Sequence, residues 1–196
     1  MDICIFGDSI AWGDVDSEKG GWVERLRMYL YKRESNTYVY NLSIPGDTSS
    51  DLLERITAET AARTPHLIVI AIGINDSAYV KTEENFRVAI ETFKKNLASI
   101  TEICRRHTKN IVFIGLTHVD ESKTLPRPND RMIFYKNSNI ETYDNAIKGF
   151  AAVNGLDYVG LKEIVTICDV ADGLHPNAEA HEKIFLRIKE AIEQYL

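Results

Sequence analysis

The chain has 196 residues, of which 44% are apolar and 27% are charged. This composition is close to that of ordinary globular domains and excludes a disordered or fibrous chain. The net charge of −6 argues against nucleic acid as the main partner, because binding a phosphate backbone requires a basic surface. No apolar run approaches the roughly 18 residues that span a bilayer. We therefore expect one domain over residues 1–196 without an integral membrane segment.

The three cysteines, Cys4, Cys104 and Cys168, are odd in number and form no CxxC pair. This pattern is neither a disulfide framework nor a zinc-binding spacing. A reducing compartment is the simplest interpretation. The N-terminus has no basic start and no apolar stretch of signal-peptide length. These features predict a cytoplasmic protein; the alternative is a chain that has lost its leader.

Five short apolar runs, rich in β-branched residues, predict β-strands. They cover residues 3–6, 38–42, 67–72, 111–114 and 156–159. Runs of this kind without polar alternation are typical of strands covered on both faces of a sheet. The second run is less apolar than the third, which favours a place nearer the edge.

Apolar residues at steps of three and four predict helices between these strands. The pattern is clear over residues 84–107 and 184–195, and less clear over residues 22–31, 51–62 and 140–153. Alternation of strands and helices indicates a parallel sheet with helices on both faces. Five strands in a chain of this length fit a flavodoxin-like α/β fold, in which ligands bind beyond the carboxyl ends of the strands.

Residue types suited to nucleophilic catalysis follow the predicted strands. Ser9 comes directly after the first strand, while Asp172 and His175 precede the last helix. A serine hydrolase needs a hydroxyl nucleophile, a histidine base and a carboxylate that orients the base. The backbone N–H groups of Ser9 and Gly46 and the side-chain amide of Asn75 are candidate donors to an oxyanion.

Each of these residues also has a structural interpretation. Ser9 or His175 could cap the helix that follows it, and Gly46 could serve a turn alone. Asn75 and its neighbour Asp76 could cap the approach to the next helix, but an amide suits an oxyanion better than a carboxylate. Asp8 fits a role in supporting the turn before Ser9.

The remaining histidines are weaker candidates for the base. His66 precedes the third strand, at the wrong end of the sheet, and His107 lies at the end of a predicted helix. His181 has no carboxylate on its own loop. His118 follows the fourth strand and is the one rival; we expect it to line the substrate pocket rather than to act as the base.

Four sequence blocks occur in the order expected for a known hydrolase family. They are Gly7-Asp8-Ser9-Ile10, the single Gly46, Gly73-Ile74-Asn75-Asp76 and Asp172-Gly173-Leu174-His175-Pro176. Together they resemble the blocks of the SGNH, or GDSL-type, hydrolases, and the resemblance extends from Gly7 to the last helix. One departure is isoleucine at position 10 where leucine is usual.

The resemblance implies a three-layer α/β/α sandwich with a five-stranded parallel sheet. It also implies that Ser9 is the nucleophile of a catalytic triad with Asp172 and His175, and that Gly46 and Asn75 join the Ser9 N–H in the oxyanion hole. The family contains esterases, thioesterases, lipases, lysophospholipases and carbohydrate deacetylases.

We therefore expect a serine hydrolase that cleaves small carboxylic esters through an acyl-enzyme, with no cofactor and no metal. Short-chain acyl or acetyl esters are the first candidate substrates, and thioesters and lysophospholipids are others. A catalytically inactive domain that binds glycans or another ligand is the alternative. The sequence contains neither a GxGxxG nor a GxxxxGK[ST] motif. It therefore gives no indication of a nucleotide-binding protein.

The segment of residues 117–139 lacks a clear period and contains Pro126, Arg127 and Tyr135. Loops of this length in compact domains are usually functional or mobile. We expect this segment to form one wall of the substrate pocket; a solvated insertion is the alternative. Trp12 could lie at the rim of the site or in the core.

Overall fold

The computed structural model describes residues 1–33 and 36–196. Its central sheet has five parallel strands in the order β2-β1-β3-β5-β7. Their bounds are β1 (Asp2–Gly7), β2 (Tyr38–Asn41), β3 (Leu67–Ala71), β5 (Ile111–Ile114) and β7 (Asp157–Val159). Each predicted strand is present within one residue of its expected bounds, and β2 lies at an edge as its weaker hydrophobicity indicated.

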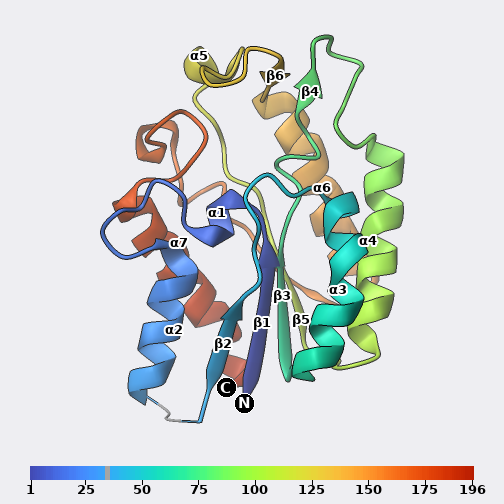
Figure 1. Ribbon diagram of the computed structural model, residues 1–196, viewed down its shortest axis with the longest axis vertical. Helices are drawn as coiled ribbons and strands as arrows, with labels where there is room; N and C mark the ends of the chain where they lie inside the picture. The colour runs from blue at the N-terminus through green and yellow to red at the C-terminus, as the bar shows by residue number, and fades with distance from the viewer. Residues whose placement is uncertain (34–35) are drawn as a thin grey trace.

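Helices cover both faces of the sheet, which confirms the predicted three-layer α/β/α fold (Figure 1). Strand side chains alternate between the faces. Cys4 and Phe6 of β1 therefore pack with α3, α4 and α6, whereas Ile3 and Ile5 pack with α2 and α7. The bounds are α2 (Gly21–Arg33), α3 (Ser49–Arg63), α4 (Ile90–Arg105), α6 (Asn137–Val153) and α7 (Ala178–Ile192). These two apolar layers leave the carboxyl ends of the strands free to carry a site.

The helix predicted over residues 84–107 is shorter than expected, because α4 begins at Ile90. Phe86 instead forms an antiparallel bridge with Tyr79 and packs against the ring of Tyr143, with centroids 6.0 Å apart. The Tyr143 hydroxyl donates to the Val88 carbonyl at 2.5 Å. These tertiary contacts hold residues 84–89 in turns and bends around one bridge, although their apolar spacing is helical. The prediction was wrong over residues 84–89 for this reason.

The final helix begins before its apolar pattern. α7 starts at Ala178, two residues after Pro176 and six before Ile184, and a 3₁₀ turn (Glu193–Tyr195) follows it. The side chain of Asn177 caps α7 by accepting a hydrogen bond from the Ala180 N–H at 2.9 Å. The first turn of α7 combines small alanines with Glu179 and His181 and so adds little to the apolar periodicity.

A small antiparallel pair stands above the carboxyl end of the sheet. It joins β4 (Tyr79–Val80) to β6 (Ile133–Phe134), with the rings of Tyr79 and Phe134 stacked at 4.9 Å. The segment 117–139, for which no element was expected, contributes β6 and the short helix α5 (Glu121–Thr124). In Figure 1 this pair and α5 lie at the top of the molecule, beyond the ends of the strands.

None of the helices in residues 1–33 and 36–196 combines the length and the hydropathy needed to cross a membrane.

Candidate active site

The turn after β1 places Ser9 at the first residue of the short helix α1 (Ser9–Trp12). Asp8, rather than Ser9, caps α1, because its carboxylate accepts from the Ile10 N–H at 2.9 Å. Gly7 precedes this turn, and a Cβ at its position would lie 2.5 Å from the Ala11 Cβ and 2.8 Å from the Ala71 carbonyl oxygen. Gly7 therefore allows the turn to pack closely against its neighbours. Because Asp8 caps the helix, the Ser9 hydroxyl is not used in capping.

Ser9 and His175 meet although 166 residues separate them in the chain. The Ser9 Oγ lies 2.9 Å from the His175 Nε2, and the His175 Nδ1 lies 2.7 Å from an oxygen of Asp172. A carboxylate only accepts hydrogen bonds, so Nδ1 carries the proton and Nε2 accepts from the serine hydroxyl. This is the arrangement of a nucleophile, a base and a carboxylate that orients the base.

The loop before α7 fixes Asp172 independently of the imidazole ring. One carboxylate oxygen accepts from the backbone N–H groups of Leu174 and His175 at 3.0 and 2.8 Å. Burial would raise the pKa of Asp172, but the hydrogen bonds from the ring and backbone of His175 and from Leu174 hold that pKa well below its usual range. Asp172 is thus ionised and rigid, as a residue that orients an imidazole must be.

Gly46 and Asn75 line the same cavity as Ser9 and His175, with a volume of about 210 Å³. Gly46 has φ of +88°, in the left-handed region, so the loop before α3 turns here with the backbone exposed to the cavity. The Asn75 Nδ2 donates one hydrogen to the Asp47 carbonyl at 3.0 Å. An amide nitrogen carries two hydrogens, which leaves the second for a ligand.

Tyr135 positions Asn75, a function that the sequence patterns did not reveal. Its hydroxyl donates to the Asn75 Oδ1 at 2.7 Å, and the side chain is 1% exposed. With Oδ1 so occupied, the orientation of the amide is determined and its nitrogen is directed away from Tyr135. The sequence placed Tyr135 in the segment expected to form a wall of the pocket. It gave no indication that this tyrosine contacts Asn75.

Two buried carboxyl groups, Asp8 and Asp76, adjoin Ser9 and Asn75 in the chain. Burial raises the pKa of Asp8 to about 7; the Ile10 N–H bond and His175 oppose this shift, and Asp76 and Asp47 add to it. Burial also raises the pKa of Asp76 to about 6, against the hydrogen bonds from Ser49. The Ser49 N–H donates to both Asp76 oxygens at 3.0 Å. Asp76 therefore holds the start of α3 and does not cap α4.

His118 lies apart from these residues. Its Nε2 is 3.3 Å from the Glu141 Oε1, and it is not among the residues that line the cavity around Ser9. Trp12 is 51% exposed and so is not a core residue. From the segment 117–139, Arg127 and Tyr135 do line the cavity, as the predicted pocket wall requires.

The fold is an α/β sandwich. Its site brings a serine, a histidine and an aspartate into hydrogen-bond contact beyond the carboxyl ends of the parallel strands. The model of the GDSL-like Lipase/Acylhydrolase family matches residues 5–183. The chain belongs to this family.

Individual relatives agree with this assignment. Esterase TesA of Pseudomonas aeruginosa is 31% identical over 114 residues, which cover 58% of this chain and 53% of that protein. The chain thus aligns with about half the length of this curated relative. A crystal structure of TesA superposes over 100% of both chains, with 26% identity and a TM-score of 0.77.

A more distant structure shows the same fold. The acetylxylan esterase Axe2 of Geobacillus stearothermophilus, as a catalytic mutant, is 19% identical over 97% of this chain and 93% of its own, with a TM-score of 0.76.

Proposed function

We propose that the chain is a carboxylic-ester hydrolase that acts through an acyl-enzyme on Ser9. The observation that carries this proposal is the continuous contact from the Ser9 Oγ through His175 to Asp172, at 2.9 and 2.7 Å. Membership of a lipase and acylhydrolase family and similarity to esterase TesA support it.

In the first half of the reaction, the Ser9 Oγ attacks the acyl carbon while its proton passes to the His175 Nε2. Negative charge develops on the carbonyl oxygen, where the backbone N–H groups of Ser9 and Gly46 and the Asn75 amide are the proposed donors. The bond to the leaving group then breaks, and His175 returns the proton to the leaving oxygen. Asp172 stabilises the imidazolium throughout.

In the second half, a water molecule loses a proton to His175 and attacks the acyl-enzyme carbon. The bond to the Ser9 Oγ breaks, the serine regains its proton and a carboxylic acid leaves. The proposed steps use side chains and backbone N–H groups of this chain together with water. Short acyl groups such as acetyl are the proposed substrates, and the cavity around Ser9 has a volume of about 210 Å³.

Substitution of the nucleophile tests the mechanism. Ser9→Ala should abolish hydrolysis of 4-nitrophenyl acetate, and the unsubstituted chain should be labelled at Ser9 by a fluorophosphonate probe. Ser138, an exposed residue in the first turn of α6, offers a matched control: Ser138→Ala should retain both the activity and the labelling. Full activity of Ser9→Ala would exclude this nucleophile, and absence of labelling in an inactive chain would favour the ligand-binding alternative.

We also propose a cytoplasmic location, on the evidence of the cysteines. Cys4 and Cys104 are buried as free thiols, and Cys168 is an exposed free thiol. An exposed thiol that has no partner suits a reducing compartment. Fractionation of the producing cells with an antibody to the chain tests this; recovery from the medium or the periplasm would contradict it.

A further inference from the structure

Two arginines line the cavity around Ser9 but belong to none of the four sequence blocks. We propose that Arg87 and Arg127 together bind an anionic group of the substrate, a carboxylate or a phosphate, so that this enzyme prefers esters that carry such a group close to the scissile bond. The inference rests on the proposed hydrolase function and specifies its substrate class.

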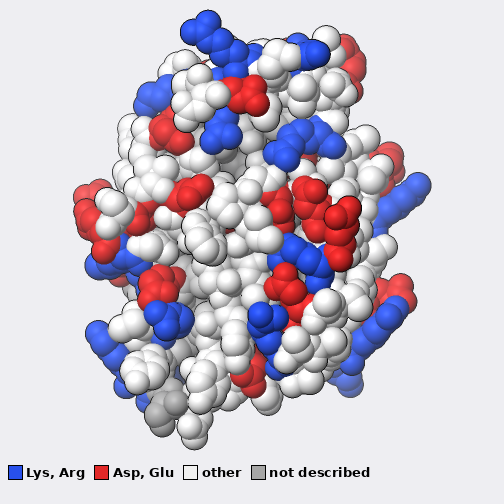
Figure 2. Space-filling view, viewed as in Figure 1, with Lys and Arg blue, Asp and Glu red and all other residues white. Residues whose placement is uncertain are grey.

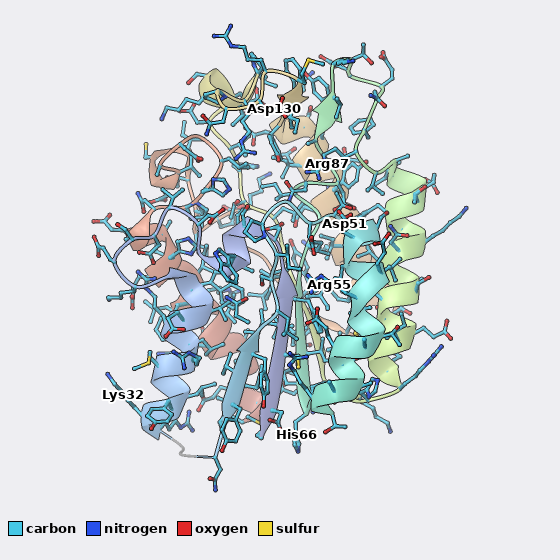
Figure 3. All side chains as sticks on the ribbon, in the orientation of Figure 1. Lys32, Asp51, Arg55, His66, Arg87 and Asp130 are labelled. Atoms are coloured by element: carbon cyan, nitrogen blue, oxygen red, sulfur yellow. The ribbon has the colours of Figure 1, made fainter. Side chains whose placement is uncertain are left out.

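The two guanidinium groups reach the site from different segments. Arg87 lies between β4 and α4, and its Nη2 donates to the Gly46 carbonyl at 2.9 Å. Arg127 follows α5, and its backbone N–H donates to the Ile133 carbonyl at 2.9 Å. Both are half-buried and both line the cavity that contains Ser9. In Figure 3, the labelled Arg87 lies at the upper part of the site, below β4.

Tyr135 provides an independent indication that the two charges converge. Burial raises the pKa of the Tyr135 hydroxyl, while the nearby charges of Arg127 and Arg87 act to lower it. Tyr135 is bonded to Asn75 of the proposed oxyanion hole, and these two residues and both arginines line the same cavity. Figure 2 shows basic side chains beside the hollow in this upper region of the surface.

Neither arginine forms a salt bridge with another described residue, although the chain is acidic overall. The comparable arginines do have such partners: Arg25 is paired with Asp16, and Arg55 lies 2.7 Å from Asp47. Arg87 keeps a hydrogen bond to the Gly46 carbonyl, but neither guanidinium is paired with a carboxylate, so the hydration lost on partial burial is not replaced by an opposite charge. A bound anion would restore that loss.

The charges of the cavity wall favour an anion over a neutral ligand. Among the residues that line the cavity, Arg87 and Arg127 are basic and Asp14 is acidic, whereas the buried carboxyl groups of Asp8 and Asp76 do not reach its wall. Arginine binds carboxylates and phosphates through paired N–H donors, which gives direction as well as charge. Because Arg87 and Arg127 line the same cavity as Ser9, an anionic group that they bind belongs to the part of the substrate next to the scissile ester.

Matched ester pairs test the proposal. 4-Acetoxybenzoate and its methyl ester differ by a carboxylate on the leaving group, and 4-acetoxyphenyl phosphate replaces that carboxylate with a phosphate. Mono-4-nitrophenyl adipate and 4-nitrophenyl hexanoate differ by a carboxylate on the acyl group. We expect kcat/KM for the anionic member to exceed that of the neutral member by about tenfold or more in one of these comparisons, as for one charged hydrogen bond.

Variants connect this preference to the arginines. Arg127→Gln should lower the ratio of anionic to neutral kcat/KM by about tenfold, and Arg127→Lys should lower it less, because the charge remains. Arg106→Gln, a matched change at an exposed residue paired with Glu102, should leave the ratio unchanged. High salt should weaken the preference by screening. An equal rate for both members of every pair, or a ratio unchanged in Arg127→Gln, would overturn the proposal.

A binding measurement separates this proposal from the hydrolase mechanism. Calorimetric titration of Ser9→Ala with 4-hydroxybenzoate and with its methyl ester requires no turnover. Tighter binding of the carboxylate, lost in Ser9→Ala/Arg127→Gln, supports the anion site even if no ester is cleaved. Equal, weak binding of both compounds to a chain that hydrolyses neutral esters through Ser9 would remove the anion site alone.

Discussion

At the scale of single residues, the orientation of one amide governs the proposed oxyanion hole. Asn75 uses one amide hydrogen on the Asp47 carbonyl and its oxygen on the Tyr135 hydroxyl, at 3.0 and 2.7 Å. The side chain is 3% exposed, so it has little freedom to turn. Preorganisation of this kind is what makes a donor effective when charge develops on a substrate oxygen. We therefore propose Tyr135 as a positioning residue, distinct from the groups that would touch the reacting atoms.

Tyr135→Phe should lower kcat on 4-nitrophenyl acetate by about tenfold with a much smaller change in KM, because it removes one buried hydrogen bond that orients Asn75. Asn75→Ala, which removes the donor itself, should cost about 10²–10³ in kcat. Tyr143→Phe is the matched control, since the Tyr143 hydroxyl is also buried but donates to the Val88 carbonyl. Equal kinetics for Tyr135→Phe and Tyr143→Phe would contradict the positioning role.

At the scale of elements, a buried ion pair holds the loop that joins α1 to α2. The Asp16 carboxylate accepts from the N–H groups of Glu18, Lys19 and Gly21 and from the Arg25 guanidinium. Gly13 and Gly21 meet inside this loop, and a Cβ on Gly13 would lie 2.4 Å from the Gly20 carbonyl oxygen. Although burial would raise the pKa of Asp16, these hydrogen bonds hold it well below its usual range. The loop adjoins the site and contributes Asp14 to its wall.

Asp16→Asn should lower the free energy of unfolding by about 3 kcal/mol, because Arg25 would keep a buried charge without its main partner. Urea denaturation measures this directly. Lys19→Gln, which removes an exposed partner of Glu182, should change stability by less than about 1 kcal/mol. If the two variants were equally stable, the buried pair would not be what secures the loop.

At the scale of the whole molecule, the packing of α7 against the sheet makes stability depend on pH. His181 of α7 is 0% exposed, and both ring nitrogens are buried. Burial, opposed by Asp16 and the Asp14 backbone and aided by Arg25 and His175, lowers the pKa of His181 to about 4. The unfolded chain binds this proton at the ordinary histidine pKa of about 6.5. Stability should therefore fall as the pH drops from about 6.5 to about 4.

The loss attributable to His181 should reach about 3 kcal/mol, since one pKa unit corresponds to about 1.4 kcal/mol. His181→Leu removes the titrating ring from an apolar layer and should flatten this part of the curve of unfolding free energy against pH. His107→Gln, at a half-buried histidine outside that layer, should reproduce the curve of the unsubstituted chain. Parallel curves for His181→Leu and the unsubstituted chain would show that another group causes the acid sensitivity.

The sequence alone determined the layers of the fold and the residues of the proposed triad. Both follow from local signals: continuous apolar runs specify strands that are buried on two faces, and small or polar residues that end those strands must gather at one edge of a parallel sheet. Helix bounds were less well predicted where a first turn lacks large apolar residues, as at Ala178, or where distant aromatic rings hold an apolar segment out of a helix, as at Phe86.

Only the tertiary structure decided how the site is supported and what surrounds it. Tyr135 contacts Asn75, which is 60 residues away in the chain. Arg87 and Arg127 line the same cavity as Ser9, whereas His118 does not. All of these relations join residues that are far apart in the sequence. Such contacts are set by how the loops pack above the sheet, and no local periodicity encodes that packing. For this reason the chemistry of the site could be predicted from sequence motifs, whereas its proposed selectivity required three-dimensional coordinates.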